Sequence, residues 1–209
     1  MQTVDLESWP RREIYEFFSP LANPFYSVTF RLDVTELYRY VKEKGLSFYY
    51  SLIWLCTRAV NRTEAFSYAI SEGRVVKLDE RWPSFTDLKK DAETFHIVTM
   101  PCEGSMAEFC AAARLKSQMQ DFFLDYSQEG EALIFFSCLP WVDVTALTNE
   151  RDGNVDDAVP RIAWGKMVEE NGRRTLGLSI EVNHRFIDGL HIGQFARELE
   201  RSIREIRNM

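Results

Sequence analysis

The succession of strand, turn and helix near the carboxyl end constrains the fold of this chain more than any other sequence feature. Residues 175–182 form an apolar run of the kind found in strands, and residues 190–206 have helical periodicity. Between them, His184, Asp188 and Gly189 form the pattern His-x-x-x-Asp-Gly, in which aspartate and glycine end the strand. The pattern predicts an imidazole where a strand meets a helix, a place where rigid scaffolds hold catalytic groups. Histidine titrates near neutral pH and so suits proton transfer, although a core histidine at a turn would give the same pattern.

Periodicity along the rest of the chain predicts an α+β fold with a large mixed sheet, in a single domain spanning 1–209. Helices are expected at 10–20, with Ser8 as its cap, and at 33–44, 47–62 and 105–126. Strands are expected at 25–33, 66–70, 75–79, 84–88, 95–100 and 132–137, with a hairpin of 161–168 and 175–182 around 170–172. The polar stretch 147–160 has the composition of an exposed insertion.

Composition excludes several classes of function. The net charge of −7 argues against broad electrostatic binding to nucleic acid or to an anionic membrane surface. No apolar run approaches the length of a membrane helix, and the first residues lack the features of a signal peptide. The four cysteines match no metal or redox spacing, so we expect a cytoplasmic protein without a metal.

Several segments spread over nearly the whole chain resemble the chloramphenicol acetyltransferase family. These segments are 9–13 (Trp-Pro-Arg-Arg-Glu), 31–35, 47–49, 93–95, 136–141 (Phe-Ser-Cys-Leu-Pro-Trp) and 182–191, which includes the histidine motif. The last two are the most specific. The resemblance implies a sandwich of two layers, in which helices cover the large mixed sheet.

The resemblance also implies a mechanism, with His184, Ser137 and Asp188 as the catalytic set. His184 would be the general base that takes a proton from a hydroxyl group of a small acceptor, which then attacks acetyl-CoA directly. Ser137 would donate a hydrogen bond to the oxyanion of the tetrahedral intermediate. Asp188 would be structural, paired with Arg11, and would not form a charge relay with the histidine.

The family also implies an assembly, a pocket and a biological role. It implies a cytoplasmic homotrimer in which His184 and Ser137 come from neighbouring subunits, with acetyl-CoA as acyl donor and antibiotic resistance as the role. Phe17, Phe18 and Phe95 would line the acceptor pocket, although aromatic residues at such spacing are usually core.

Three departures from the family pattern bear on the acceptor. Asn183 replaces the first histidine of a His-His pair, Ala163 replaces a threonine that helps hold water near the oxyanion, and 142–147 replaces a phenylalanine-rich stretch. Chloramphenicol or a related hydroxyl compound is the expected acceptor, and these changes argue for a related compound.

Two alternatives stay open at this point. The Asn-His-Arg sequence at 183–185 is also similar to the signature of dihydrolipoyl acyltransferases, although a lipoyl domain is not recognisable in the sequence. The chain could instead be a catalytically silent trimer that binds a small molecule or an acyl-CoA.

Overall fold

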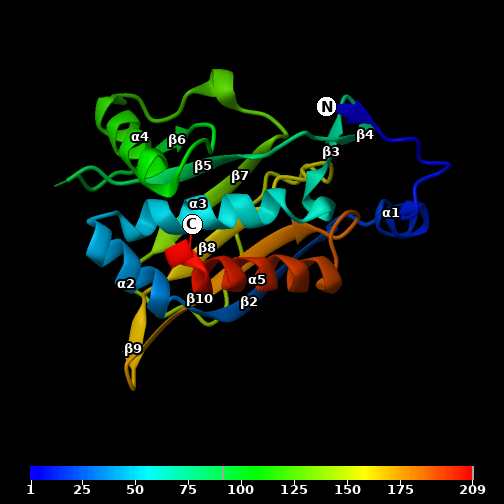
Figure 1. Cartoon of the computed structure of the whole chain (residues 1–209). Helices are drawn as coiled ribbons and strands as arrows, with labels where there is room; N and C mark the ends of the chain where they lie inside the picture. Colours follow the sequence, from blue (N-terminus) through cyan, green and yellow to red (C-terminus); the bar gives the residue numbers. More distant parts are fainter. Residues whose placement is uncertain (91, 209) are drawn as a thin grey trace.

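A mixed seven-stranded sheet forms the centre of the computed structural model, which describes residues 1–90 and 92–208 (Figure 1). The strand order is β2-β10-β8-β7-β5-β6, and β9 pairs with β10 beside this path. The strands β5, β7 and β8 are parallel to one another, whereas β2, β6 and β10 pair antiparallel to their neighbours. The strand bounds are β2 Phe25–Asp33, β5 Trp82–Asp87, β6 His96–Thr99, β7 Leu133–Leu139, β8 Arg161–Gly165, β9 Val168–Glu170 and β10 Arg173–Asn183.

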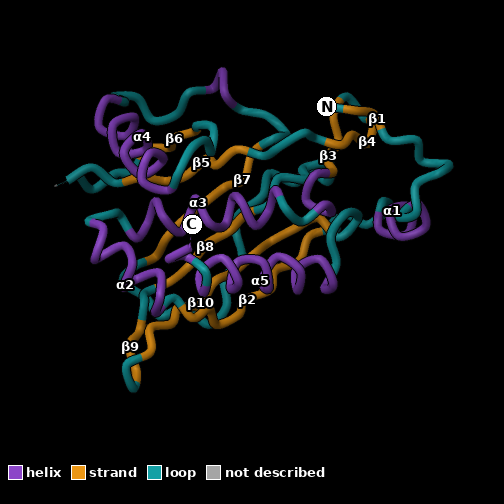
Figure 2. The backbone as a smooth tube through the Cα atoms, in the orientation of Figure 1, coloured by secondary structure: helices purple, strands orange, loops and turns teal. Residues whose placement is uncertain are grey.

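Helices cover one face of this sheet (Figure 2). The helices are α1 Arg12–Phe18, α2 Thr35–Lys44, α3 Phe48–Asn61, α4 Met106–Met119 and α5 Gly189–Arg204, with short 3-10 turns at Glu64–Ser67, Tyr126–Gln128 and Ile206–Asn208. α3 and α5 contact each other and lie across the sheet, while α1 lies at one end of the molecule (Figure 1). The predicted α+β class with a large mixed sheet is therefore confirmed.

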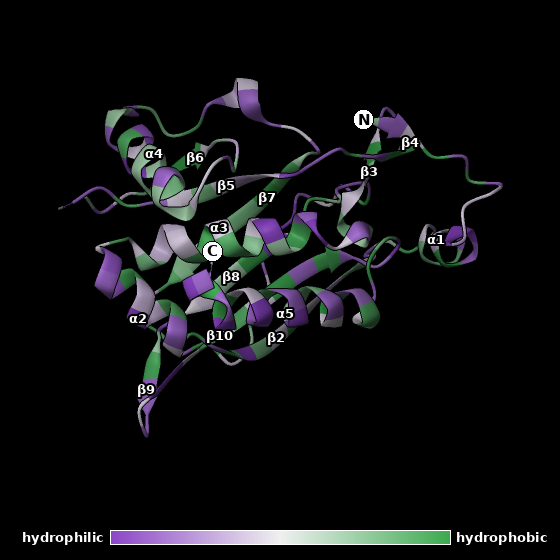
Figure 3. Cartoon of the chain, in the orientation of Figure 1, coloured by the Kyte–Doolittle hydropathy of each residue, from purple (hydrophilic) through white to green (hydrophobic). Residues whose placement is uncertain are grey.

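The alternation of side chains along the strands separates the two faces. Phe136, Ile162 and Ile180 are almost fully buried on the face that the helices cover. The helix α3 is nearly all apolar and is buried against them, as expected of a core helix. Hydrophobic residues accordingly follow β7, β8 and β10 in Figure 3. Because successive side chains point to opposite faces, Ser137, Arg161 and other polar residues lie on the face that has no helices.

The ends of several helices differ from the prediction. α4 is capped by Ser105 as its sequence suggests, but it ends at Met119, because the Gln120 side chain instead donates to the carbonyls of Ile97 and Phe122. The predicted helix to residue 126 was therefore too long. α1 was expected to be capped by Ser8, but its N-cap is Arg11, which makes no side-chain cap.

A small three-stranded sheet of β1 Gln2–Thr3, β4 Arg74–Lys77 and β3 Tyr68–Ser71 lies beside the main sheet. The buried Arg81 connects the two regions. It donates to the carbonyls of Tyr68, Leu133 and Ala158, which belong to the small sheet, the main sheet and the 147–160 loop.

The segment after Trp141 closes over the face without helices. A Cβ atom at Gly165 or Gly177 would collide with the backbone of 142–144, so glycine is required at both positions for this close approach. The hydroxyl of Ser179 on β10 then donates to the carbonyl of Leu147 at 2.8 Å.

The 147–160 loop is only in part the exposed insertion that its composition suggested, since residues 148, 150, 152–154 and 156 are exposed. Residues 158–160 are buried, and the Arg151 side chain keeps only 8% of its surface exposed. Asn183 donates to the carbonyls of Val155 and Asp157, and Arg185 pairs with Asp156 at 2.9 Å. Some of the polar residues of the loop therefore make these bonds, while others face water.

Candidate active site

The turn between β10 and α5 carries His184 and is held by one arginine from the start of the chain. Arg11 precedes α1, and its guanidinium donates to the carbonyls of His184 and Arg185 at 3.1 and 2.9 Å. It also pairs with Asp188 at 2.8 Å, and the two side chains keep 11% and 30% of their surface exposed. One planar cation therefore binds both ends of the turn.

Aromatic rings hold the imidazole of His184. The ring of Phe18 stacks on it with centroids 4.0 Å apart, and the ring of Tyr26 lies at 4.4 Å. Among the residues that the structure describes, none hydrogen-bonds a ring nitrogen of His184. Partial burial lowers the pKa of His184, the charge of Arg11 lowers it further, and Asp188 opposes them. The arrangement favours a neutral imidazole that can accept a proton near pH 7.

The carboxylate of Asp188 contacts Arg11, Leu190 and His191, but not the imidazole of His184. It accepts from the backbone N–H of Leu190 at 3.0 Å and caps α5, while His191 closes the same capping box. Burial is the largest single influence and would raise the pKa of Asp188, but the hydrogen bond and charge of Arg11, the charge of His191 and the N–H of Leu190 together hold the pKa below its usual range. Asp188 is thus a charged cap that fixes the turn.

Ser137 lies elsewhere in the chain, on the face of β7 that has no helices. It lines a broad open cavity of about 1880 Å³, together with Phe95, Trp141 and Arg161. Ser137 pairs with Ala163, which pairs with Ser179 on β10. His184 follows Ser179 by five residues, so it lies about 16 Å along the strand and about 10 Å across two strand spacings from Ser137.

The predicted site residues therefore form two separate groups within one chain. The first group lies around the β10–α5 turn and contains Arg11, Phe18, His184 and Asp188, with Phe17 packed edge-on against Phe18 at 5.0 Å. The second group is Ser137 and Phe95 in the cavity. Phe95 is 49% exposed and packs against Phe123.

Sequence reasoning missed two contributors to these groups. Tyr26, on the half-buried strand β2, contacts the imidazole, and its pKa is raised to about 12, mainly by burial. Arg151, in the cavity wall, pairs with Glu181. One signal for this pair was available, because Glu181 interrupts an otherwise apolar strand.

The remaining histidine and the cysteines have structural positions. His96 is buried, and its Nε2 lies 3.1 Å from the hydroxyl of Ser117 on α4. The four cysteines are free. Within 1–90 and 92–208, no cluster of three or more His, Cys, Asp or Glu could hold a metal ion. Over the same residues, no helix combines the length and the apolar character needed to cross a membrane.

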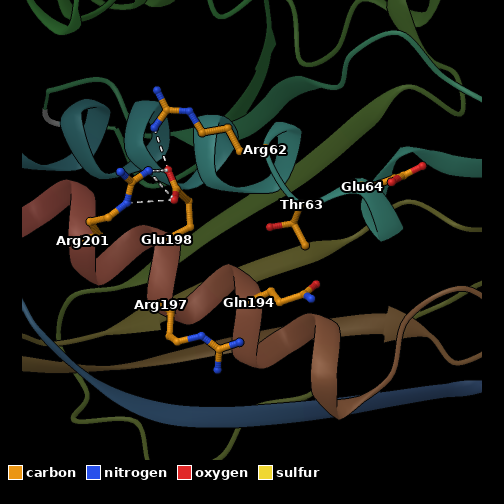
Figure 4. A pocket seen from close by; sticks show the side chains of 7 residues that line it. All are labelled: Arg62, Thr63, Glu64, Gln194, Arg197, Glu198 and Arg201. Carbon is orange, nitrogen blue, oxygen red and sulfur yellow. Dashed lines mark hydrogen bonds and ion pairs between the residues drawn. The ribbon is translucent and has the colours of Figure 1, made fainter.

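A second, shallower depression lies between the carboxyl end of α3 and the helix α5 (Figure 4). Glu198 there accepts hydrogen bonds from both Arg62 and Arg201, while the side chain of Arg197 points away from this pair in Figure 4. None of the predicted site residues lines this depression.

Comparison with known proteins supports one family. A family model described as chloramphenicol acetyltransferase matches residues 1–200. Chloramphenicol acetyltransferase 2 of Escherichia coli is 30% identical over 200 residues, which cover 94% of each chain. A solved chloramphenicol acetyltransferase superposes with a TM-score of 0.89 at 26% identity, covering 97% of this chain and 99% of the other. A dihydrolipoamide acetyltransferase of Azotobacter vinelandii shares the fold alone, with a TM-score of 0.68 at 19% identity, over 94% of this chain and 87% of the other.

Proposed function

The chain belongs to the chloramphenicol acetyltransferase family, whose members are acetyl-CoA-dependent O-acetyltransferases, and on that premise we propose how its residues divide the reaction. The acetyl group passes from acetyl-CoA to a hydroxyl of a small acceptor, either chloramphenicol or a related compound. The carrying observation is the environment of His184, a stacked imidazole with a lowered pKa.

His184 is the general base in this proposal. It takes the proton of the acceptor hydroxyl, whose oxygen attacks the thioester carbonyl. The charge that develops on the carbonyl oxygen is stabilised by a hydrogen bond from Ser137. When the tetrahedral intermediate collapses, the carbon–sulfur bond breaks and the imidazolium returns its proton to the leaving CoA sulfur. No covalent bond to the protein is required.

We infer that each site is assembled from two subunits. Ser137 and His184 of one chain are too far apart to act on the same acetyl group, because both must reach atoms of a single thioester. A homotrimer, as the family resemblance implies, would bring the His184 turn of one subunit against the Ser137 face of the next. The open cavity beside Ser137 is the surface that such a neighbour would cover.

An assay of thiol release from acetyl-CoA tests the proposal. The wild-type protein should release CoA only when an alcohol acceptor is present, and His184→Ala should lose turnover while keeping its melting temperature. His191→Ala is the comparison: it removes the other histidine near the turn together with its capping-box contact, so it should lower the melting temperature but keep most of the turnover. Near-normal kcat in His184→Ala would exclude His184 as the base.

A further inference from the structure

The two residues on either side of His184 in the sequence are bonded to a distant segment of the chain. Asn183 is the last residue of β10 and Arg185 lies in the turn, and both are almost fully buried. Their side chains bind residues 155–157 of the 147–160 loop. The backbone of His184 therefore lies between two anchored neighbours.

The side-chain amide of Asn183 uses its full hydrogen-bonding capacity. Its Nδ2 donates to the carbonyls of Val155 and Asp157 at 3.0 and 3.1 Å. Its Oδ1 accepts from the backbone N–H and from the Nε of Arg185 at 3.1 and 3.2 Å. An amide offers two N–H donors and an oxygen that accepts two hydrogen bonds, so these four contacts specify asparagine at this position.

Arg185 joins the same segment to the helix that packs on the imidazole. Its guanidinium pairs with Asp156 at 2.9 Å and also donates to the carbonyl of Val155. It lies over the ring of Tyr15 on α1, 5.7 Å from the centroid. Because α1 also carries Phe18, which stacks on the imidazole, Arg185 connects the loop, the turn and this aromatic contact.

The 155–157 segment is itself fixed to the main sheet. Asp157 pairs with Arg151 at 2.6 Å and with Arg161 at 3.0 Å, and Arg151 also pairs with Glu181 at 2.6 Å. Arg161 belongs to β8 and Glu181 to β10. All four side chains are largely buried, so a movement of the segment would leave buried charges without partners. The segment is a firm support for the turn.

The imidazole of His184 depends on such a support because its own contacts are aromatic. The rings of Phe18 and Tyr26 pack on it, and aromatic contacts of this kind tolerate a range of offsets. A general base must instead lie within hydrogen-bond reach of the hydroxyl group it deprotonates. The direction of the imidazole is therefore set by the backbone, whose N–H donates to the carbonyl of Pro24 and whose carbonyl accepts from Arg11.

We propose that residues 155–157, acting through Asn183 and Arg185, position the imidazole of His184 for proton abstraction. The two are positioning residues, since they act through the backbone of His184 and not on the acceptor. The inference rests on the proposed function, because the placement of His184 affects turnover only if His184 is the base. It goes further by giving a role to the asparagine that replaces a family histidine and to the loop that holds it.

Nuclear magnetic resonance of the imidazole signals measures this placement without requiring turnover. The chain has three histidines, so their signals can be assigned by substitution in protein made with isotope-labelled histidine. The Cε1–H signal of His184 should lie upfield, because hydrogen atoms over the face of an aromatic ring are shielded and the ring of Phe18 lies against the imidazole. At about pH 8 the imidazole is neutral, so the signal reports its position and not its protonation.

Two variants break the contact with the loop. Asn183→Asp keeps the shape of the side chain and can still accept from Arg185, but it replaces two donors by an oxygen that faces two carbonyls. We expect the His184 signal to move downfield and kcat to fall at least about 10-fold, since a misplacement of about 1 Å can cost about 10²-fold in rate. The KM for acetyl-CoA should change less than about two-fold, because substrate binding does not require proton abstraction.

Arg185→Lys should change the signal and kcat in the same direction. It keeps the charge beside Asp156 but loses the forked guanidinium that also reaches Val155 and Asn183. Because it adds no charge, it separates a displaced imidazole from the effect of the new carboxylate in Asn183→Asp. It also decides the question if Asn183→Asp does not fold.

Asn61→Leu is the matched control for a loss of stability alone. Asn61 on α3 likewise makes two bonds to the backbone, to the carbonyl and from the N–H of Arg81, at 3.0 and 2.8 Å. The variant should lower the melting temperature without moving the His184 signal or lowering kcat. If it changes the signal as the other variants do, the response is a general effect of destabilisation and the inference is wrong.

The failure of this inference differs from the failure of the proposed function. If the signal or kcat is unchanged in the folded variants while the wild-type protein acetylates its acceptor, the 155–157 contacts only stabilise the fold and the proposed function stands. If the wild-type protein acetylates no acceptor, the proposed function fails and the role in proton abstraction fails with it.

Discussion

Arg11 and Asp188 form an ion pair at 2.8 Å, although 177 residues separate them along the chain. The pair joins the segment before α1 to the N-cap of α5, and the same guanidinium binds the His184 carbonyl. The position of the imidazole thus depends on a contact between the two ends of the sequence.

Separating the Arg11–Asp188 pair should destabilise the fold and lower activity together. We expect Asp188→Asn to cost roughly 2–3 kcal/mol of unfolding free energy, less than the ~3–5 kcal/mol of a fully buried pair, because Asp188 keeps some exposure. Chemical denaturation of Asp188→Asn, Arg11→Ala and the double variant measures the coupling. Additive losses would show that the two residues do not stabilise each other.

The lowered pKa of His184 predicts an acidic limb in the pH dependence of kcat/KM. The limb should have an apparent pKa below 6.5, since burial and Arg11 both disfavour the imidazolium. Activity should rise with pH through that value and be constant at pH 7. Asp188 favours the imidazolium, so Asp188→Asn should move the limb to still lower pH. A limb above 6.5 would contradict the proposed environment.

The same shift has a consequence for stability. The pKa of His184 is lower in the folded protein than in the unfolded chain. At pH values between these two pKa values the unfolded chain binds more protons than the folded protein, so the free energy of unfolding increases with pH in this range. The contribution of His184 is present above about 6.5 and is lost as pH falls through the lower folded value. In His184→Ala this part of the pH dependence should disappear from denaturation curves.

Local pattern was enough to predict most of the secondary structure. The strand at 25–33 has the predicted bounds, and Ser47 caps α3 as its sequence suggested. Local signals are sufficient in these cases because alternation and capping depend on a few adjacent residues. The end of α4 was missed because Gln120 bonds to Ile97, a partner that local sequence does not reveal.

The polar network of the candidate site could not be predicted for the same reason. Arg151 and Glu181 are 30 residues apart, and each looks like an ordinary solvated charge until the loop folds back over β10. The polar composition of 147–160 therefore suggested exposure, although Arg151 and Asp157 are buried against each other.

Ser137→Ala should lower kcat by roughly 10²–10³, which is the usual cost of losing one oxyanion donor. The acceptor KM should change much less, because the bond forms mainly in the transition state. Steady-state kinetics separates the two parameters. The matched control is Ser84→Ala, which removes a serine hydroxyl on β5 that accepts a hydrogen bond from Thr99 on β6. A raised KM with unchanged kcat would make Ser137 a binding residue.

Mixing two impaired variants should restore activity if each site is shared between subunits. His184→Ala subunits retain Ser137, and Ser137→Ala subunits retain His184. Unfolding and refolding the two together should form some interfaces with both groups intact, so activity should rise above that of either variant refolded alone. Light scattering should show a trimer in each sample. Lack of recovery in mixed trimers would place the site within one chain.

Chloramphenicol should be a poor acceptor, with kcat/KM below about 10⁴ M⁻¹s⁻¹. Ala163 lies beside Ser137 and replaces the family threonine, so it cannot help hold a water near the oxyanion. Ala163→Ser should therefore raise kcat for every acceptor without changing their ranking. A value for the wild-type protein at or above about 10⁴ M⁻¹s⁻¹ would show that this departure is tolerated and that chloramphenicol is an acceptor.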